Sequence, residues 1–503
     1  MSRTHDMHAA EKSDEIIVPL KSANNAVETA AEPMEGRVST EGNTVEATAA
    51  QTQRWSPASS GLDGVRRAAR KQRDLKFTNL LHHVSVEQLH EGYLSIERRA
   101  APGVDGERWE DWQADLGDRL RDLHCRIHSG AYRAKPARRI YIPKADGTQR
   151  ALSVWCLEDK VVQQAVVQVL NMIYESDFLG FSYGFRPGRS QHDALDALAV
   201  GLQRCKVSWV LDADIQKFFD QMEHDWVMRF VEHRIADKRV LRLIRKWLRV
   251  GTLEEGVRVP CTRGAPQGAV ISPLLANIYL HYVADLWTQQ WREKRATGDM
   301  VVVRYADDEV LGFQTYHDAN RFRVELEKRL AKFGLKLHPE KTRLIRFGRF
   351  AMSHCRRRNG GKPETFDFLG FTHYCTTARK TGWFAIGRKT IKKRMVASLQ
   401  ATKSAIRRRM HRPVYETGAW LKRVLRGHLN YFAVPGNQAS LSCYFRKVAW
   451  YWLRSLRRRS QRHRMDWHRF ERLRDRFFPK IVVRHPYPWV RFDATTRGRS
   501  PVR

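Results

Sequence analysis

The chain of 503 residues carries 90 Lys and Arg against 54 Asp and Glu, which gives a formal net charge of +36. So basic a protein usually binds a polyanion, and nucleic acid is the favoured partner. No stretch approaches the roughly 18 uninterrupted apolar residues of a membrane span. The N-terminus has no basic segment followed by an apolar one, so we expect neither a membrane partner nor a secretory signal.

The seven cysteines are scattered, and no two of them form a C-x-x-C pair. This pattern argues against a cysteine-based zinc module and a disulfide framework, and it fits a reducing cytoplasm. We therefore predict a cytoplasmic protein.

Residues 1–60 differ in composition from the rest of the chain. They are rich in Ala, Glu, Thr and Ser and hold five Lys or Arg against nine Asp or Glu. Such a segment buries too little apolar surface to order itself, so we predict a flexible leader. From about 62 to 135, apolar residues recur at helical spacing, and a turn-rich loop at 101–106 interrupts them.

Residues 138–152 predict a β-hairpin with two cations near its tip. A strand over 139–143 leads into turn-forming residues, and the hairpin carries Lys144 and Arg150. Both could reach one triphosphate, the lysine as a point charge and the arginine as a planar fork. The alternative is a pair of solvated cations with no further role.

A loop at 182–190 follows a helix that we expect to be buried (161–173). The loop combines Tyr183 and Phe185 with Arg186 and Arg189. These side chains could grip a nucleic-acid backbone and stack on a base. A packed loop with stray cations is an equally good interpretation.

Two acidic segments are candidates for one metal site. Residues 209–215 are typical of a strand that carries Asp212 and Asp214 on one face. Tyr305-Ala306-Asp307-Asp308 lies between two apolar runs and predicts a strand, a tight turn and a second strand. Alone, that turn is most simply a solvated hairpin tip. If Asp214 lies opposite the turn, the carboxylates suit Mg²⁺, which prefers oxygen ligands.

A Gly- and Pro-rich loop at 263–273 opens a long helix from 274 to about 291. Small residues at a helix start let a nucleotide or template approach the backbone closely. A plain helix-capping loop is the alternative. A helix over about 318–333 and a strand over 366–371 follow.

Most of the excess charge lies at the C-terminal end. Residues 386–503 hold 31 Lys or Arg against five Asp or Glu. Helical patterns cover about 389–411, 415–432, 438–460 and 465–477, with aromatic residues interleaved. Basic helices with an apolar face suit a grip on folded RNA or a hybrid duplex. We expect most of the aromatic side chains to form a core, and we expect the charge to meet a polyanion.

In this order, the motifs resemble those of a group II intron-encoded reverse transcriptase/maturase in a form that lacks an HNH endonuclease domain. The resemblance covers roughly residues 75–503, and the stretch at 426–432 resembles the maturase (X, or thumb) domain. The motifs are Lys144 and Arg150, the loop 183–190, residues 214–220, Pro266-Gln267-Gly268, residues 305–308 and Phe368-Leu369-Gly370.

The resemblance implies an α+β fold of the right-hand polymerase type. Residues 61–385 would form helical fingers and a palm with an antiparallel sheet. Residues 386–503 would form an all-helical basic thumb, or maturase domain, with a basic C-terminal tail.

The resemblance also assigns roles to individual residues. Asp214, Asp307 and Asp308 would hold two Mg²⁺ ions, helped by the backbone carbonyl of Ile215, and would be the catalytic carboxylates. The nucleotide-binding residues would be Lys144 and Arg150 at the triphosphate, Phe219 under the sugar, where it rejects a 2′-hydroxyl, and Gln267 beside the template. The nucleic-acid contacts that we predict are Arg186, Arg189, Arg426, Arg457 and Arg458.

One segment departs from the family pattern. The family usually carries Pro-Leu-Gly-Ile-Pro after the hairpin arginine, whereas this chain has Ala-Leu-Ser-Val-Trp at 151–155. That segment lies near the templating nucleotides in the family, so the departure bears on the grip of the template.

We therefore predict an RNA-directed DNA polymerase that uses an RNA template, a DNA primer and deoxynucleoside triphosphates. It would also bind its parent group II intron RNA and assist splicing and intron mobility. Two alternatives stay open, namely an RNA-binding splicing maturase with little polymerase activity, and a free-standing reverse transcriptase in repair or defence.

Overall fold

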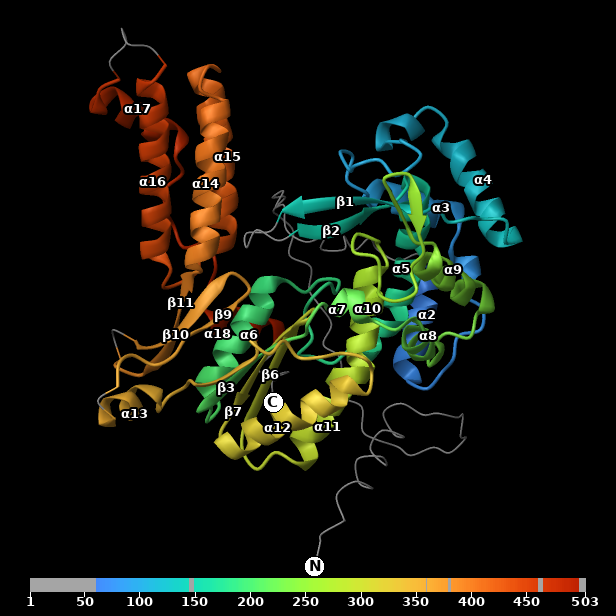
Figure 1. Ribbon diagram of the computed structural model, residues 1–503, viewed down its shortest axis with the longest axis horizontal. Helices are drawn as coiled ribbons and strands as arrows, with labels where there is room; N and C mark the ends of the chain where they lie inside the picture. The colour runs from blue at the N-terminus through green and yellow to red at the C-terminus, as the bar shows by residue number, and fades with distance from the viewer. Residues whose placement is uncertain (1–59, 144–148, 359, 379–380, 460–464, 497–503) are drawn as a thin grey trace, which may run out of the picture.

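The computed structural model describes residues 60–143, 149–358, 360–378, 381–459 and 465–496. Helices and mostly antiparallel sheets form an α+β fold, as predicted. Figure 1 shows the N-terminal helices on the right, a central sheet in the middle and a column of C-terminal helices at the upper left. Except for Ser60, the predicted leader lies outside the described residues, and so does Lys144.

The N-terminal helices surround α5 (Leu157–Asp177), which is buried on nearly every side. Even polar residues such as Gln163, Gln164 and Asn171 are buried there, because α2, α3 and α10 all pack against the helix. The helices on this side are α2 (Ser60–Lys71), α3 (Val86–Ser95), α4 (Leu116–Ser129), α8 (His224–Glu232) and α9 (Lys238–Arg249), with short 3-10 turns at Leu81–His83 and Trp109–Trp112.

The predicted cationic hairpin is present as β1 (Ala137–Pro143) and β2 (Gln149–Val154). It belongs to a four-stranded sheet in which β1 also pairs, in parallel, with β4 (Thr252–Glu254). The antiparallel neighbour of β4, β5 (Val257–Val259), completes the order β2-β1-β4-β5.

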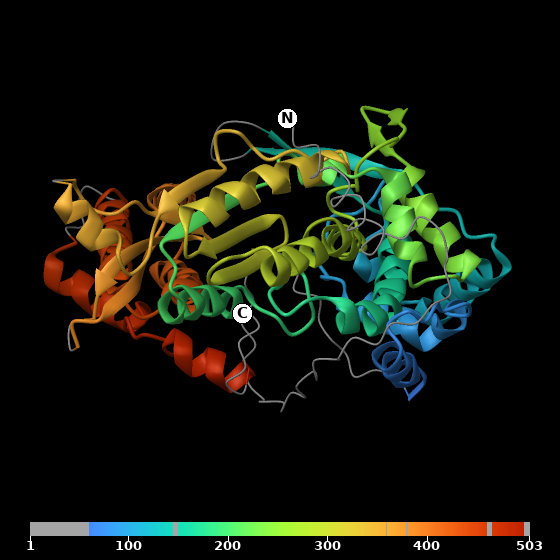
Figure 2. The same ribbon diagram turned by 90° about the horizontal axis from the view of Figure 1, so that it is seen from below.

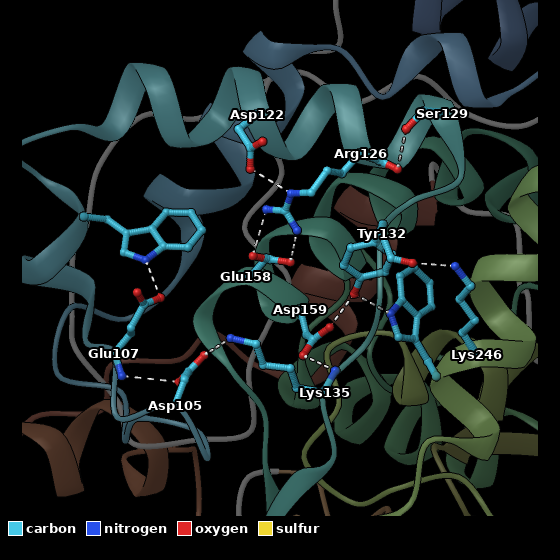
Figure 3. Close-up of polar contacts among 12 residues, drawn as sticks. Asp105, Glu107, Asp122, Arg126, Ser129, Tyr132, Lys135, Glu158, Asp159 and Lys246 are labelled. Atoms are coloured by element: carbon cyan, nitrogen blue, oxygen red, sulfur yellow. Dashed lines mark hydrogen bonds and ion pairs between the residues drawn. The ribbon is translucent and has the colours of Figure 1, made fainter.

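A polar network holds the segment that leads into β1, as Figure 3 shows. Arg126 on α4 donates two hydrogen bonds to Glu158, at 2.9 and 3.0 Å. The neighbouring Asp159 accepts from the Tyr132 hydroxyl and from the backbone N–H of Lys135. The Lys246 ammonium donates to the Tyr132 carbonyl at 2.5 Å. Helices α4, α5 and α9 are thus tied to one short loop.

Burial raises the pKa of Asp159 from 3.8 to about 7. A carboxyl whose folded-state pKa is raised binds a proton on folding, so its contribution to stability is lost as the pH rises from about 4 through about 7. We expect Asp159→Asn to reduce the drop in melting temperature between about pH 5 and about pH 8. Thermal unfolding of both proteins at both pH values measures this difference. Equal drops in the two proteins would contradict it.

The central sheet has the order β6-β7-β3-β8 and is antiparallel throughout. The strands on either side of the acidic turn hold unbroken apolar runs, residues 300–303 and 310–313, because helices cover both faces of the sheet. Val301 and Val303 pack toward α6, whereas Val302 packs toward the core shared with α12. Figure 2 shows the strands between these two helices. The elements are β3 (Trp209–Asp214), β6 (Met300–Tyr305), β7 (Asp308–Phe313), β8 (Arg343–Arg346), α6 (Gln191–Arg204) and α12 (Tyr316–Ala331).

The long helix predicted from residue 274 contains a break in its regular winding. It runs as α10 (Ser272–Leu280), a five-residue π segment (His281–Asp285) and α11 (Leu286–Lys294). A π segment is rare and often marks a functional site, since it turns the face that follows it.

The prediction of a single strand over residues 366–371 is wrong. The structure has two strands there, β9 (Phe366–Phe368) and β10 (Phe371–Thr377), paired with Phe368 opposite Phe371. Leu369 and Gly370 form the two-residue loop, and both have positive φ. That combination is the one a tight hairpin requires. The third strand of this sheet is β11 (Phe384–Thr390).

The C-terminal helices agree with the predicted patterns and pack around their own core of aromatic and leucine side chains. The boundary predicted at residue 386 falls inside β11, and the first of these helices begins at Lys392. A further helix, α18 (Pro488–Thr496), was not predicted, and it packs against α6. The others are α14 (Lys392–Arg408), α15 (Val414–Phe432), α16 (Gln438–Arg457) and α17 (Trp467–Phe477). None of the helices in the described ranges has the length and apolar character needed to cross a membrane.

Candidate active site

The turn between β6 and β7 has two residues. Tyr305 pairs with Asp308, which leaves Ala306 and Asp307 as the loop. Ala306 has a φ of +58°, a conformation in which glycine is favoured and an L side chain is strained. The hairpin predicted from the two apolar runs is confirmed, and its tip carries a strained residue directly before Asp307.

Asp214 ends β3 directly opposite Asp308 on β7. The pairing therefore brings Asp214 and Asp308 to the same end of the sheet, where the turn carries Asp307. Burial raises the pKa of Asp307, and the charge of Asp214 raises it further. The Asp308 side chain reaches solvent, yet desolvation by the surrounding protein and the charges of Asp307 and Asp214 raise its pKa to about 7. Raised pKa values of this origin mark a site that favours a cation.

A cation of the protein already lies at this site. The Lys341 ammonium is 2.9 Å from Asp214 Oδ2, and its side chain is 65% exposed. Within the described residues, no three His, Cys, Asp or Glu side chains are arranged to hold a metal ion as they stand. The donor set nevertheless suits a divalent ion, because its carboxylate oxygens are the ligands that Mg²⁺ prefers and Lys341 is an exposed, movable stand-in. Ile215 follows Asp214 and bridges to Leu337.

Arg150 and Gln267 meet beside the carboxylates. Arg150 Nε donates to Gln267 Oε1 at 3.1 Å, and Gln267 Nε2 donates to Asp220 at 3.4 Å. The charge of Arg150 lowers the pKa of Asp307, which places the guanidinium within electrostatic reach of the turn. The structure thus brings together two of the four predicted nucleotide-binding residues, from the hairpin and from the Gly- and Pro-rich loop.

Phe219 lies next to the same loop, on the short helix α7 (Phe218–Gln221). Its carbonyl accepts from the backbone N–H of Ala265 at 2.8 Å. A Cβ on Gly264 would lie 2.9 Å from that carbonyl oxygen, so the loop can run this close only with glycine there. The position of the half-buried Phe219 ring is therefore fixed through the hydrogen bond and close packing of its backbone.

The segment that departs from the family pattern is ordinary β-structure. Residues 151–154 belong to β2, and the Ser153 N–H donates to the Gln267 carbonyl at 2.7 Å. A Cβ on Gly268 would lie 2.3 Å from the Ser153 carbonyl oxygen. Trp155 is fully buried. The altered residues thus support the loop that carries Gln267.

The expectation that Arg186 grips nucleic acid is corrected by its burial. Its side chain is 2% exposed and pairs with Glu175 at 2.9 Å. It also donates to the carbonyls of Leu179 and Ser182, so it fastens the loop 182–190 to α5. Arg189 is half-buried and donates to the Ser182 carbonyl at 3.1 Å. The packed-loop interpretation holds for Arg186, whereas a nucleic-acid contact by Arg189 stays a prediction.

The three predicted contacts in the C-terminal helices are exposed: Arg426 on α15, Arg457 at the end of α16 and Arg458 after it. Arg457 Nε donates to the Met465 carbonyl at 3.1 Å. Their placement leaves them accessible to a large ligand, and nucleic-acid binding by them stays a prediction.

Two residues at the site received no role from the sequence, Lys341 and Arg304. Lys341 follows Glu340 in a polar stretch, which gives no sign of a partner 127 residues away. Arg304 is an isolated charge at the end of an apolar strand, next to the acidic turn. The sequence did hold one signal for Arg304, a single cation in an apolar run that must be buried. A buried charge requires partners.

Residues 142–373 match the family model for reverse transcriptase (RNA-dependent DNA polymerase). The matched span contains the three carboxylates, Arg150, Phe219 and Gln267.

Several curated proteins are similar to this chain. Protein YkfC of Escherichia coli strain K12 is 37% identical, over 43% of this chain and 65% of that protein. The group II intron-encoded protein LtrA of Lactococcus lactis subsp. cremoris is 36% identical, over 33% of this chain and 27% of LtrA. The putative COX1/OXI3 intron 2 protein of Saccharomyces cerevisiae is 30% identical, over 51% of this chain and 27% of that protein. The chain spans less than two thirds of each relative. These matches confirm the resemblance predicted from the motifs.

Proposed function

We propose that this protein is an RNA-directed DNA polymerase that also binds its parent intron RNA. Residues 142–373 match the reverse transcriptase family model, and a group II intron-encoded protein is among the relatives. The observation that carries this proposal is the meeting of Asp214, Asp307 and Asp308 with Arg150 and Gln267. Acids from the ends of adjacent strands and a cation from a separate hairpin suit phosphoryl transfer.

The proposed reaction extends a primer by one deoxynucleotide. The primer 3′-hydroxyl attacks the α-phosphate in line, and pyrophosphate leaves. Two Mg²⁺ ions held by the three carboxylates, with the Ile215 carbonyl, would supply activation of the attacking oxygen and charge stabilisation of the leaving one. Arg150 neutralises the triphosphate and Gln267 aligns the nucleotide with the template. Lys341, whose ammonium lies 2.9 Å from Asp214 Oδ2, would have to release that carboxylate for it to hold an ion.

The right-hand division of the chain is part of this proposal. The central sheet would be the palm, the N-terminal helices with the hairpin β1–β2 the fingers, and α14–α17 the thumb. The thumb would bind the hybrid duplex and the intron RNA through exposed arginines such as Arg426, Arg457 and Arg458. Intron binding would assist splicing by stabilising the folded RNA, and reverse transcription would serve intron mobility.

Primer extension on an RNA template tests the polymerase activity. With a DNA primer, the four deoxynucleoside triphosphates and Mg²⁺, we expect full-length DNA that disappears when EDTA chelates the metal. No product at any salt concentration would overturn the proposal and favour a splicing maturase with little polymerase activity.

A further inference from the structure

Arg304 is the best-satisfied buried charge near the site. Its side chain is 1% exposed, and that of its partner Asp285 is 0% exposed. Arg304 Nε donates to Asp285 Oδ1 at 2.7 Å, and Nη2 donates to Asp285 Oδ2 at 2.5 Å. The three remaining donors reach Ser182 Oγ at 2.7 Å, Asn277 Oδ1 at 3.2 Å and the Ala306 carbonyl at 2.8 Å. All five N–H groups of a guanidinium are thus used.

The acceptor at Ala306 connects this cluster to the strained turn. Ala306 holds its positive φ without the freedom of glycine, so its surroundings must impose that conformation. Arg304 holds the Ala306 carbonyl from one side. From the other, Gly184 lies so close that a Cβ there would be 2.2 Å from Ala306 N. Asn277 Nδ2 donates to the Gly184 carbonyl at 2.7 Å and so joins the two supports.

The cluster draws on three segments far apart in the sequence. Ser182 and Gly184 belong to a loop that runs beside β6, where the Tyr183 N–H donates to the Arg304 carbonyl. Asn277 lies on α10, and Asp285 ends the π segment. The irregular winding therefore occurs where the helix supplies the carboxylate that orients Arg304. Burial alone accounts for the use of every donor. The placement of one acceptor on the strained turn and of the carboxylate on the π segment is what connects the cluster to the site.

We propose that Arg304 and Asp285 form a positioning pair that fixes the turn carrying Asp307 and Asp308 and so sets the rate of nucleotide addition. The inference rests on the proposed function, because it deepens the account of that same site. The five donors of Arg304 go to Asp285, Ser182, Asn277 and Ala306, and none goes to a carboxylate of the proposed metal site. It acts through the backbone of Ala306, one residue before Asp307.

The test compares two buried arginines replaced by lysine. Lysine keeps the charge but cannot serve five acceptors in a plane. In Arg304→Lys we expect kcat for single-nucleotide addition to fall roughly tenfold or more, since small displacements of reacting groups are costly. KM for the nucleotide should stay within about twofold, and the Mg²⁺ concentration for half-maximal rate should rise. Asp285→Asn should likewise lower kcat while KM for the nucleotide stays within about twofold.

Arg234→Lys is the matched control. Arg234 is 3% exposed and pairs with Asp177, and its side chain donates to the Ala69 carbonyl on α2 rather than to the turn. This variant should lose comparable thermal stability yet keep kcat and the Mg²⁺ dependence. Ser182→Ala, which removes one hydrogen bond only, is the milder variant for use if Arg304→Lys does not fold, and it should show a smaller fall in kcat.

Three outcomes decide the matter. A fall in kcat confined to the Arg304 cluster supports the inference. Unchanged kcat in folded Arg304 or Ser182 variants, or an equal fall in Arg234→Lys, overturns it. An inactive wild-type protein would instead be a failure of the proposed polymerase function.

Discussion

Replacing both Asp307 and Asp308 by alanine is expected to abolish DNA synthesis and to leave intron RNA binding and splicing intact. Loss of the carboxylates removes the charge that holds the metal ions at the transferring phosphoryl group. Removing such stabilisation costs about 10³-fold or more in rate. RNA binding would depend on the exposed basic helices instead, which these substitutions do not touch. Primer extension and RNA binding, measured on the same preparation, check both halves of the expectation.

Asp212→Asn provides a control on the same strand. Asp212 lies two residues before Asp214, and its carboxylate is 3.7 Å from Arg343 Nη2. It adds charge near Asp308 but is not among the proposed metal ligands, so we expect less than about a tenfold loss of rate. Residual synthesis in the double alanine variant would contradict the metal assignment. Simultaneous loss of RNA binding would count against separable roles.

Phe219→Ala should relax the choice of sugar by on the order of 10²-fold, as forcing an extra group into a well-packed site costs about 1–3 kcal/mol. In the proposed function, the ring lies under the deoxyribose and leaves no room for a 2′-hydroxyl. Its backbone is fixed by Ala265, so the ring cannot move aside easily. The ratio of kcat/KM for a deoxynucleotide to that for the matching ribonucleotide measures the effect.

Phe218→Leu separates selectivity from general damage at this helix. Phe218 is the preceding residue, is 2% exposed and packs edge-on against Phe219. Its replacement should lower stability while the sugar ratio stays near that of the wild type. An unchanged ratio in Phe219→Ala would remove Phe219 from the proposed nucleotide site.

The parts of the structure that follow local patterns were predictable from the sequence. Two apolar runs around Tyr305–Asp308 can only form a hairpin whose strands are buried on both faces. The C-terminal helices were predicted in the same way, from apolar residues that recur at helical spacing. The two-residue turn at Leu369 and Gly370 was missed because Phe-Leu-Gly-Phe is apolar throughout, and an apolar turn resembles a strand.

Partners across long distances in sequence were not predictable. Ser182 is 122 residues before Arg304, and Asp285 lies on a helix whose winding no local pattern revealed. Arg186 was misjudged for a related reason. In a loop rich in aromatic and basic residues, only the fold decides whether a guanidinium faces solvent or turns inward to a carboxylate such as Glu175.

The packing of α18 against α6 ties the column of C-terminal helices, α14–α17, back to the rest of the protein. The column leaves the body of the protein at Ile391 and rejoins it where Arg204 binds Asp493, at 2.9 Å, and Arg491 lies 3.3 Å from Asp196. Tyr431 near the end of α15 also donates to the Leu369 carbonyl at 2.7 Å, and the Asn437 side chain exchanges hydrogen bonds with Thr390 of β11. The base of the column is therefore anchored to the rest of the protein from several sides, which restricts how far the column can tilt relative to the carboxylates.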